Sequence, residues 1–113
     1  MNKPCVLSQS IEGNQVTLEL RILPSIRFFE GHFPDHPVLP GVAQIYWAES
    51  FARHYFSDLG EFTRLENIKF HSIIVPNTQI FLLLNYQPEK RKITFTYSTN
   101  EKKYSSGRLL LDR

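Results

Sequence analysis

The sequence predicts an α+β fold in which a single antiparallel sheet curls around one long helix. Two observations support this prediction: an apolar stretch from Gly41 to Phe56 that suits a helix, and four later runs of strand-forming residues separated by turn formers. A chain of 113 residues has the length of one domain, 1–113. Leu, Ile, Val and Phe supply 36 of those residues, which is enough apolar side chain for one core.

The elements follow one another in a simple order. The stretch from Gln15 to Leu23 alternates apolar and polar residues, as a half-buried strand does. The helix follows a stiff loop with three prolines, 34–40. Because apolar residues cover most of its helical wheel, we expect the helix to be buried nearly all round and to end at 58–60, with Gly60 in the left-handed cap position. The later strands are expected at 65–75, 80–86, 93–98 and 104–111.

Composition and charge exclude several classes of protein. The net charge of +2, from 13 basic and 11 acidic residues, is too small for a nucleic-acid-binding face. The longest apolar run, 80–84, is far shorter than the roughly 20 residues of a membrane-spanning helix. Cys5, the single cysteine, excludes an internal disulfide and a thiolate zinc site within one chain. The amino end lacks the apolar core of a secretory signal, so we expect a cytoplasmic protein.

One segment carries a specific motif. Residues 29–42 read FEGHFPDHPVLPGV and resemble the GHFPxxPxxPG signature of the hot-dog-fold 3-hydroxyacyl-[acyl-carrier-protein] dehydratases of the FabA/FabZ type. Residues 65–70 (LENIKF), 74–76 (IVP) and 106–108 (SGR) are also similar to that family, so the resemblance covers nearly the whole chain. The continuation PGVAQ at 40–44 and the short length most resemble the ApeI-like branch, which is found with aryl-polyene biosynthesis.

The resemblance implies a lyase that removes water from a 3-hydroxyacyl chain held on acyl carrier protein, in fatty acid or aryl polyene biosynthesis. Such a reaction needs a base, an acid and hydrogen-bond donors for the enolate oxygen. His32 is the expected base, because an imidazole titrates near neutral pH and the prolines hold it on a stiff loop. The backbone amide of Gly41 suits the thioester oxygen. The expected substrate-binding residues are Phe33, Pro40, Gly41, Val42 and Gln44.

The position of the catalytic acid departs from the family pattern. In the family this residue is a Glu or Asp fourteen residues after the motif His, and here that position is Tyr46. Glu49 lies about 4.5 Å further along the helix and on nearly the same face, so Tyr46 and Glu49 are both candidate acids. The alternative is that Glu49 has no catalytic role and lies on the exposed edge of the helix, in an i,i+4 ion pair with Arg53.

Several other features have two interpretations. Gln44 binds substrate or bonds the neighbouring backbone. Phe33 lines an acyl tunnel or anchors the loop. The basic hairpin tips 90–92 and 102–103 dock an acidic carrier protein or are solvated turns. His32 and His36 have the spacing of a metal pair, but the prolines forbid the helix that this pair would need, so we expect no metal and no other cofactor.

The expected partner, besides the carrier protein, is a second copy of the chain in a homodimer or higher oligomer, because a sheet around one helix leaves edge strands to be paired. The alternative is a heterodimer with another dehydratase. In that case the lost carboxylate at Tyr46 marks a non-catalytic subunit that binds the acyl carrier. A hot-dog thioesterase that activates water with Glu49 is a third reading, which the GHFP loop disfavours.

Overall fold

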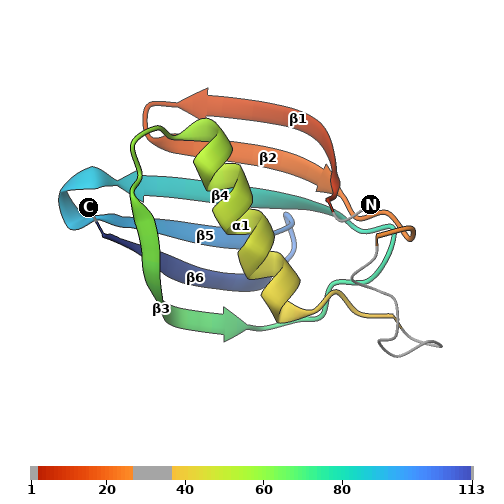
Figure 1. The fold of residues 1–113 in the computed structure, drawn as a ribbon. Helices are drawn as coiled ribbons and strands as arrows, with labels where there is room; N and C mark the ends of the chain where they lie inside the picture. Colours follow the sequence, from red (N-terminus) through yellow and green to blue (C-terminus); the bar gives the residue numbers. More distant parts are fainter. Residues whose placement is uncertain (1–2, 27–36, 113) are drawn as a thin grey trace.

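The computed structural model of the protein describes residues 3–26 and 37–112. Its main elements are one helix and six strands (Figure 1). In chain order they are β1 (Cys5–Glu12), β2 (Gln15–Arg21), α1 (Gly41–Tyr55), β3 (Glu61–Phe70), β4 (Gln79–Gln87), β5 (Lys92–Ser98) and β6 (Lys103–Asp112), with a short 3-10 turn, η2 (Pro88–Lys90), between β4 and β5.

The strands form one antiparallel sheet in the order β1-β2-β4-β5-β6-β3. Helix α1 lies across one face of that sheet (Figure 1). β1 and β3 are therefore the two edge strands, although β3 immediately follows the helix in sequence. The predicted α+β architecture, a sheet around one helix, is confirmed.

The core lies between the sheet and α1. Along β2, β4, β5 and β6 every second side chain is buried, as the pleat of a strand requires when one face is covered. Trp47, Tyr97 and Phe95 are the largest fully buried side chains. Within the described residues, no helix combines the length and apolar character that crossing a membrane would need.

The strand expected at 65–75 is placed wrongly. β3 begins at Glu61 and ends at Phe70, and the residues after it form a loop that bonds back to other segments. Leu39 donates its amide to the carbonyl of Ile74 at 2.8 Å, and the His71 amide donates to the carbonyl of Tyr104 at 2.8 Å. The apolar run at 73–75 fits a strand by composition, but the bond from Leu39 to Ile74 ties it to the loop before α1 instead.

The end and the burial of the helix also differ from expectation. α1 ends at Tyr55, and Gly60 takes its left-handed conformation (φ 76°) beyond the helix, just before β3. One face of α1 is buried, whereas Val42 is 73% exposed and Tyr46 is 51% exposed. The prediction of burial all round is therefore wrong for a single chain, because one sheet covers only one side of a helix.

Candidate active site

The expected base, His32, and the aromatic Phe33 lie outside the described residues, as does His36. The described part of the motif begins at Pro37 and leads into α1. The other expected site residues are Pro40, which caps α1, and residues of α1 itself.

Within the part of the chain that the structure describes, the first backbone amides of α1 have no helical carbonyl to accept them. Pro40 is the N-cap in an extended conformation, and its carbonyl accepts the amides of Ala43 at 3.1 Å and Gln44 at 3.3 Å. The amides of Gly41 and Val42 precede these bonds, so no carbonyl of the helix accepts them. They lie at the positive end of the helix dipole, which suits an oxygen that gains negative charge.

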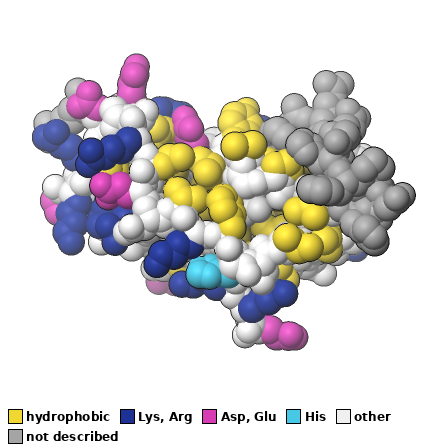
Figure 2. Space-filling view, turned by 90° about the horizontal axis from the view of Figure 1, so that it is seen from below, with side chains coloured by type: hydrophobic (Ala, Val, Ile, Leu, Met, Phe, Trp, Pro, Cys, Tyr) yellow, Lys and Arg dark blue, Asp and Glu magenta, His cyan; other side chains and the backbone are white. Residues whose placement is uncertain are grey.

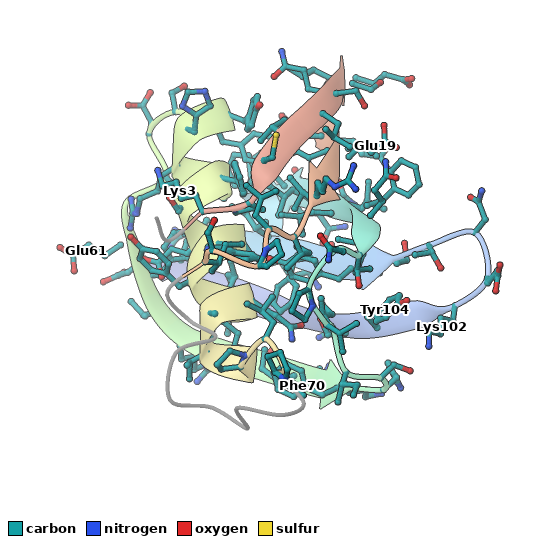
Figure 3. The ribbon with its side chains drawn as sticks, turned by 90° about the vertical axis from the view of Figure 1, so that its right-hand side faces the viewer. Lys3, Glu19, Glu61, Phe70, Lys102 and Tyr104 are labelled. Carbon is teal, nitrogen blue, oxygen red and sulfur yellow. The ribbon has the colours of Figure 1, made fainter. Side chains whose placement is uncertain are left out.

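Gly41 has a packing reason to be glycine in addition to the chemical one. A Cβ built at this position would lie 2.5 Å from Cζ of Phe70, closer than real Cβ atoms come to another atom. Figure 3 shows the Phe70 side chain, from the end of β3, beside the first turn of α1. The ring of Phe70 thus fills the space that a side chain on residue 41 would take.

Gln44 is buried, and three of its polar atoms form hydrogen bonds within the chain. Its Nε2 donates to the carbonyl of Leu39 at 3.3 Å, and its Oε1 accepts the hydroxyl of Ser105 at 2.6 Å. Its backbone carbonyl accepts the phenol of Tyr97 at 2.7 Å, and burial raises the pKa of that phenol well above its usual value. Of the two interpretations of Gln44, this geometry favours the bond to neighbouring backbone, because it joins the motif loop to α1 and the sheet.

The exposed face of α1 carries the candidate acids. Val42, Tyr46, Glu49 and Arg53 follow one another at steps of three or four residues and form a single stripe. Glu49 and Arg53 form the i,i+4 ion pair at 3.9 Å, with both side chains more than a third exposed. Arg53 also donates to the carbonyl of Gly60 at 3.0 Å and lies over the ring of Phe62. Tyr46 and Glu49 therefore lie on the same face of α1, which the sheet does not cover.

A hollow of about 260 Å³ lies beside Glu49, between α1 and β3. Ile45, Phe62 and Leu65 supply apolar walls, and Thr63 and Arg64 complete the lining. Leu65 is 47% exposed, so an apolar wall of the hollow reaches the surface. The hollow therefore places apolar side chains next to the carboxylate of Glu49.

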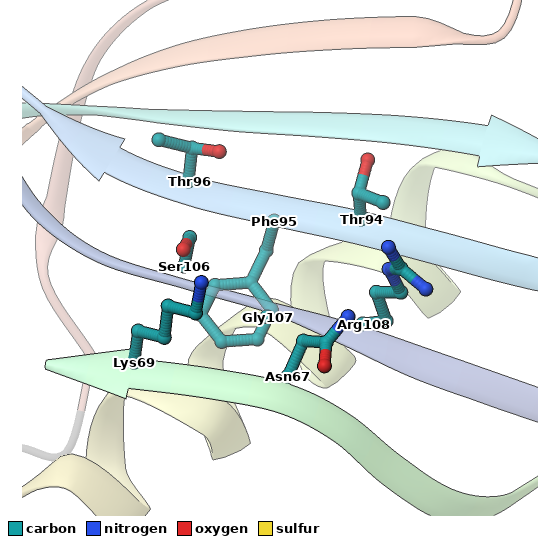
Figure 4. Close-up of a pocket in the computed structure, with 8 residues that line it drawn as sticks. All are labelled: Asn67, Lys69, Thr94, Phe95, Thr96, Ser106, Gly107 and Arg108. Atoms are coloured by element: carbon teal, nitrogen blue, oxygen red, sulfur yellow. The ribbon is translucent and has the colours of Figure 1, made fainter.

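A second hollow, of about 250 Å³, lies on the sheet across β3, β5 and β6 (Figure 4). The strand register sets its polar residues in two rows. Thr96, Ser106 and Lys69 form one row, and Thr94 and Arg108 form the next. Glu66, which is not part of the lining, is the β3 partner of Arg108. Sequence reasoning missed this cluster, although the alternation of polar residues along β5 and β6 is a signal that could have found it.

The comparisons with known proteins agree with this fold and motif. Residues 8–108 match the ApeI-like family model, described as ApeI dehydratase. The similar solved structures include the following two. One is titled the dehydratase heterocomplex ApeI:P from Xenorhabdus doucetiae, with a TM-score of 0.92, 30% identity and coverage of 98% of this chain and 99% of that chain. The other, an uncharacterized protein from Erwinia carotovora subsp. atroseptica, has a TM-score of 0.84, 32% identity and coverage of 97% and 96%.

Curated relatives are also dehydratases. The 3-hydroxyacyl-[acyl-carrier-protein] dehydratase FabZ of Buchnera aphidicola is 36% identical over 73 residues, 57% of this chain and 48% of that protein. FabZ of Tolumonas auensis is 29% identical over 106 residues, 80% of this chain and 70% of that protein. The chain thus spans about half to 70% of these two relatives.

The family match covers most of the chain, and it includes the complete GHFPxxPxxPG motif and the whole of α1. The sheet order and the single helix are those of the hot-dog dehydratase fold, and the ApeI:P chain superimposes over nearly its full length. The resemblance stated from the motif is confirmed: the chain belongs to the ApeI-like family of hot-dog-fold dehydratases.

Proposed function

We propose that the protein is a lyase that dehydrates 3-hydroxyacyl thioesters carried on acyl carrier protein, in fatty acid or aryl polyene biosynthesis. The observation that carries the proposal is the family match over residues 8–108, which contains His32, Pro40 and Gly41 in the motif pattern. Two features of the described residues support it: the first amides of α1 have no helical carbonyl to accept them, and the two candidate acids, Tyr46 and Glu49, share one face of the helix.

In the proposed reaction, His32 removes a proton from C2 of the acyl chain. The electron pair of that C–H bond forms the double bond between C2 and C3, and the C3–O bond breaks. Tyr46 or Glu49 gives a proton to the departing hydroxyl, which leaves as water. The amide of Gly41 donates a hydrogen bond to the thioester oxygen, where charge develops; loss of one such donor costs about 2.7–4 kcal/mol in comparable sites.

The substrate reaches this site as an acyl chain on its carrier. Val42 and Pro40 flank the Gly41 amide at the start of α1, so they would contact the thioester. Phe33 belongs to the same sequence motif and is proposed as a further substrate-binding residue. The basic residues at 90–92 and 102–103 would attract the acidic carrier protein. The proposal also places the protein in the cytoplasm, as a homodimer or higher oligomer.

A second candidate function is a non-catalytic subunit of a dehydratase heterodimer. Two observations favour it: Tyr46 at the position of the family carboxylate, and a solved relative whose title describes a dehydratase heterocomplex. In that case the chain binds the acyl carrier and pairs with an active homologue.

Four proteins in one assay separate the two functions: wild type, Glu49→Gln, Tyr46→Phe and Tyr46→Glu. If the chain is the enzyme, wild type converts 3-hydroxyacyl carrier protein to the enoyl product, and removal of the true acid lowers the rate by roughly 10²–10⁴. Glu49→Gln and Tyr46→Phe change volume little, so a loss of rate reports the proton donor. If the chain is the partner subunit, wild type is inert but binds the carrier, and Tyr46→Glu creates activity.

A further inference from the structure

We propose that Gln44 is a positioning residue for the dehydration: it fixes the direction of the Gly41 amide, which donates to the thioester oxygen. The inference rests on the proposed function, because that amide is the donor in the proposed reaction. Gln44 is only 3% exposed and acts through Leu39 and Pro40, the two residues that precede Gly41.

The backbone of Gln44 holds the peptide group that carries the Gly41 amide. The amide of Gln44 donates to the carbonyl of Pro40 at 3.3 Å, and the amide of Ala43 donates to the same carbonyl at 3.1 Å. This carbonyl and the Gly41 amide belong to one planar trans peptide group, in which C=O and N–H point in opposite directions. Because the carbonyl points into the first turn of α1, the N–H of Gly41 points out of it.

The side chain of Gln44 holds the peptide group before that one. Its Nε2 donates to the carbonyl of Leu39 at 3.3 Å, and the amide of Leu39 donates to the carbonyl of Ile74 at 2.8 Å. The ring of Pro40 fixes its own φ, here −61°. Both peptide groups that lead to Gly41 are therefore bonded to Gln44, which leaves the Gly41 amide little freedom to turn.

The sheet holds Gln44 in turn. Tyr97 of β5 and Ser105 of β6 lie directly opposite each other in the pairing of these strands. The hydroxyl of Ser105 donates to Oε1 of Gln44 at 2.6 Å, and the phenol of Tyr97 donates to the backbone carbonyl of Gln44 at 2.7 Å. One cross-strand pair thus fixes both the side chain and the backbone of Gln44, and it ties the start of α1 to a rigid part of the fold.

Position 44 carries a polar side chain where an apolar one would pack. The other buried residues of α1 are Ala43, Trp47, Ala48 and Ala52. A buried amide costs free energy unless hydrogen bonds satisfy it. Replacing both partners of a buried hydrogen bond with apolar groups of the same shape can be nearly neutral for stability. Stability alone therefore does not call for a glutamine here.

A fixed amide suits the proposed reaction. Negative charge develops on the thioester oxygen as the proton leaves C2, and a donor already aimed at that oxygen needs no reorganisation at that moment. A misplacement of about 1 Å can cost about 10²-fold in rate, even when the mutated residue lies away from the reacting atoms. The hydrogen bonds of Gln44 are placed to prevent such a shift of the Gly41 amide.

The network lies apart from the surfaces that a partner could cover. Seen from the β3 side, hydrophobic side chains gather over the middle of the face, with basic and acidic side chains interspersed towards one end (Figure 2). Gln44, Ser105 and Tyr97 are at most 3% exposed, so they do not contribute to that surface. A change at these positions reaches the reaction through the residues that they hold.

A double variant separates positioning from stability. Gln44→Met and Ser105→Ala each strand a buried polar group, whereas the double variant removes both partners of the 2.6 Å bond and regains part of the lost stability. If Gln44 only stabilises the fold, the rate recovers together with stability. If Gln44 positions the Gly41 amide, the double variant stays slow. We expect its kcat to be about 10- to 100-fold below that of wild type, with KM nearly unchanged, because the weakened bond forms mainly in the transition state.

Ser106→Ala is the matched control. Ser106 follows Ser105 on β6, but its side chain lies on the opposite face of the sheet, in the hollow of Figure 4. This variant should keep the kcat and the unfolding free energy of wild type. All rates are measured below the unfolding transition of each variant, so that the folded protein is compared in every case.

The NMR signal of the Gly41 amide gives a readout that does not need turnover. Butyryl acyl carrier protein has the thioester but no 3-hydroxyl group, so it cannot be dehydrated. Its titration should shift the Gly41 amide proton in wild type, and the shift should be smaller in the Gln44→Met/Ser105→Ala variant.

Recovery of kcat by the double variant overturns the proposal, as does a Gly41 shift that is absent in wild type or equal in the two proteins. An inert wild type removes the proposed function alone. In that case the Gly41 shift decides the positioning role by the same criteria.

Discussion

Replacing Gln44 with Met would break the buried link between the motif loop, α1 and β6 while keeping a similar volume. The hydroxyl of Ser105 would lose its acceptor at 2.6 Å in a site with no solvent exposure, and the carbonyl of Leu39 would lose its donor at 3.3 Å. An orphaned buried polar group costs about 1–3 kcal/mol, and the longer bond to Leu39 contributes less. We expect the free energy of unfolding to fall by about 2–4 kcal/mol, which lowers Tm by about 8–16 °C for a domain of this size.

A double-mutant cycle with Ser105→Ala measures whether the loss comes from this hydrogen bond. Ser105→Ala alone orphans Oε1 of Gln44, but combined with Gln44→Met it removes the stranded hydroxyl, so the double variant should be more stable than the sum of the two losses predicts. Thermal and urea unfolding at one protein concentration give the four values, because the proposed homodimer would make Tm depend on concentration. Strictly additive losses would refute the reasoning that Gln44 and Ser105 act as a bonded pair.

Two further predictions follow from the buried groups. Gly107→Ala should lower the unfolding free energy by about 1–3 kcal/mol, and Gly41→Ala by less. The Cβ added at residue 107 meets Ile68 and the ring of Phe95, which is 1% exposed, whereas the Cβ added at residue 41 meets Phe70, which is 51% exposed and can move. Equal losses in urea unfolding would contradict this. Burial raises the pKa of the Tyr97 phenol. In the folded protein this phenol therefore keeps a proton that it releases above pH about 10 in the unfolded chain. Stability should be unaffected below that pH and should fall by up to about 1.4 kcal/mol per pH unit above it, and Tyr97→Phe should show a shallower alkaline loss; identical slopes would contradict the assignment.

The local patterns were sufficient for most elements of the fold. The alternation in Gln15–Leu23 and the later strand runs predicted β2, β4, β5 and β6 to within two residues at each end, because period-2 burial leaves a direct mark on the sequence. The edge strand β3 was misplaced for a physical reason. All its residues are exposed or half-buried, so its burial does not alternate between buried and exposed positions. The more apolar segment after it bonds to Leu39 of the motif loop and to Tyr104 of β6.

The candidate site was predictable only in part. The motif placed Gly41 at the start of the helix, where the structure has it, and the spacing of Tyr46 and Glu49 placed both on one face of α1. The contacts of Gln44 with Ser105 and of Gly41 with Phe70 join segments far apart in the chain, and no local pattern reports them. The exposed positions Val42 and Tyr46 were predicted to be buried with the rest of α1, because composition alone does not distinguish a helix face covered by its own sheet from one that the sheet leaves uncovered.

The most direct test of the central claim compares wild type with His32→Ala on one substrate, a 3-hydroxyacyl group loaded on acyl carrier protein. Mass spectrometry follows the loss of one water from the acyl group. We predict that wild type converts the substrate and that His32→Ala, with unchanged thermal unfolding, is slower by roughly 10²–10⁴, as expected when a general base is removed. Full turnover by His32→Ala, or a wild type that binds the loaded carrier without converting it, would contradict the account.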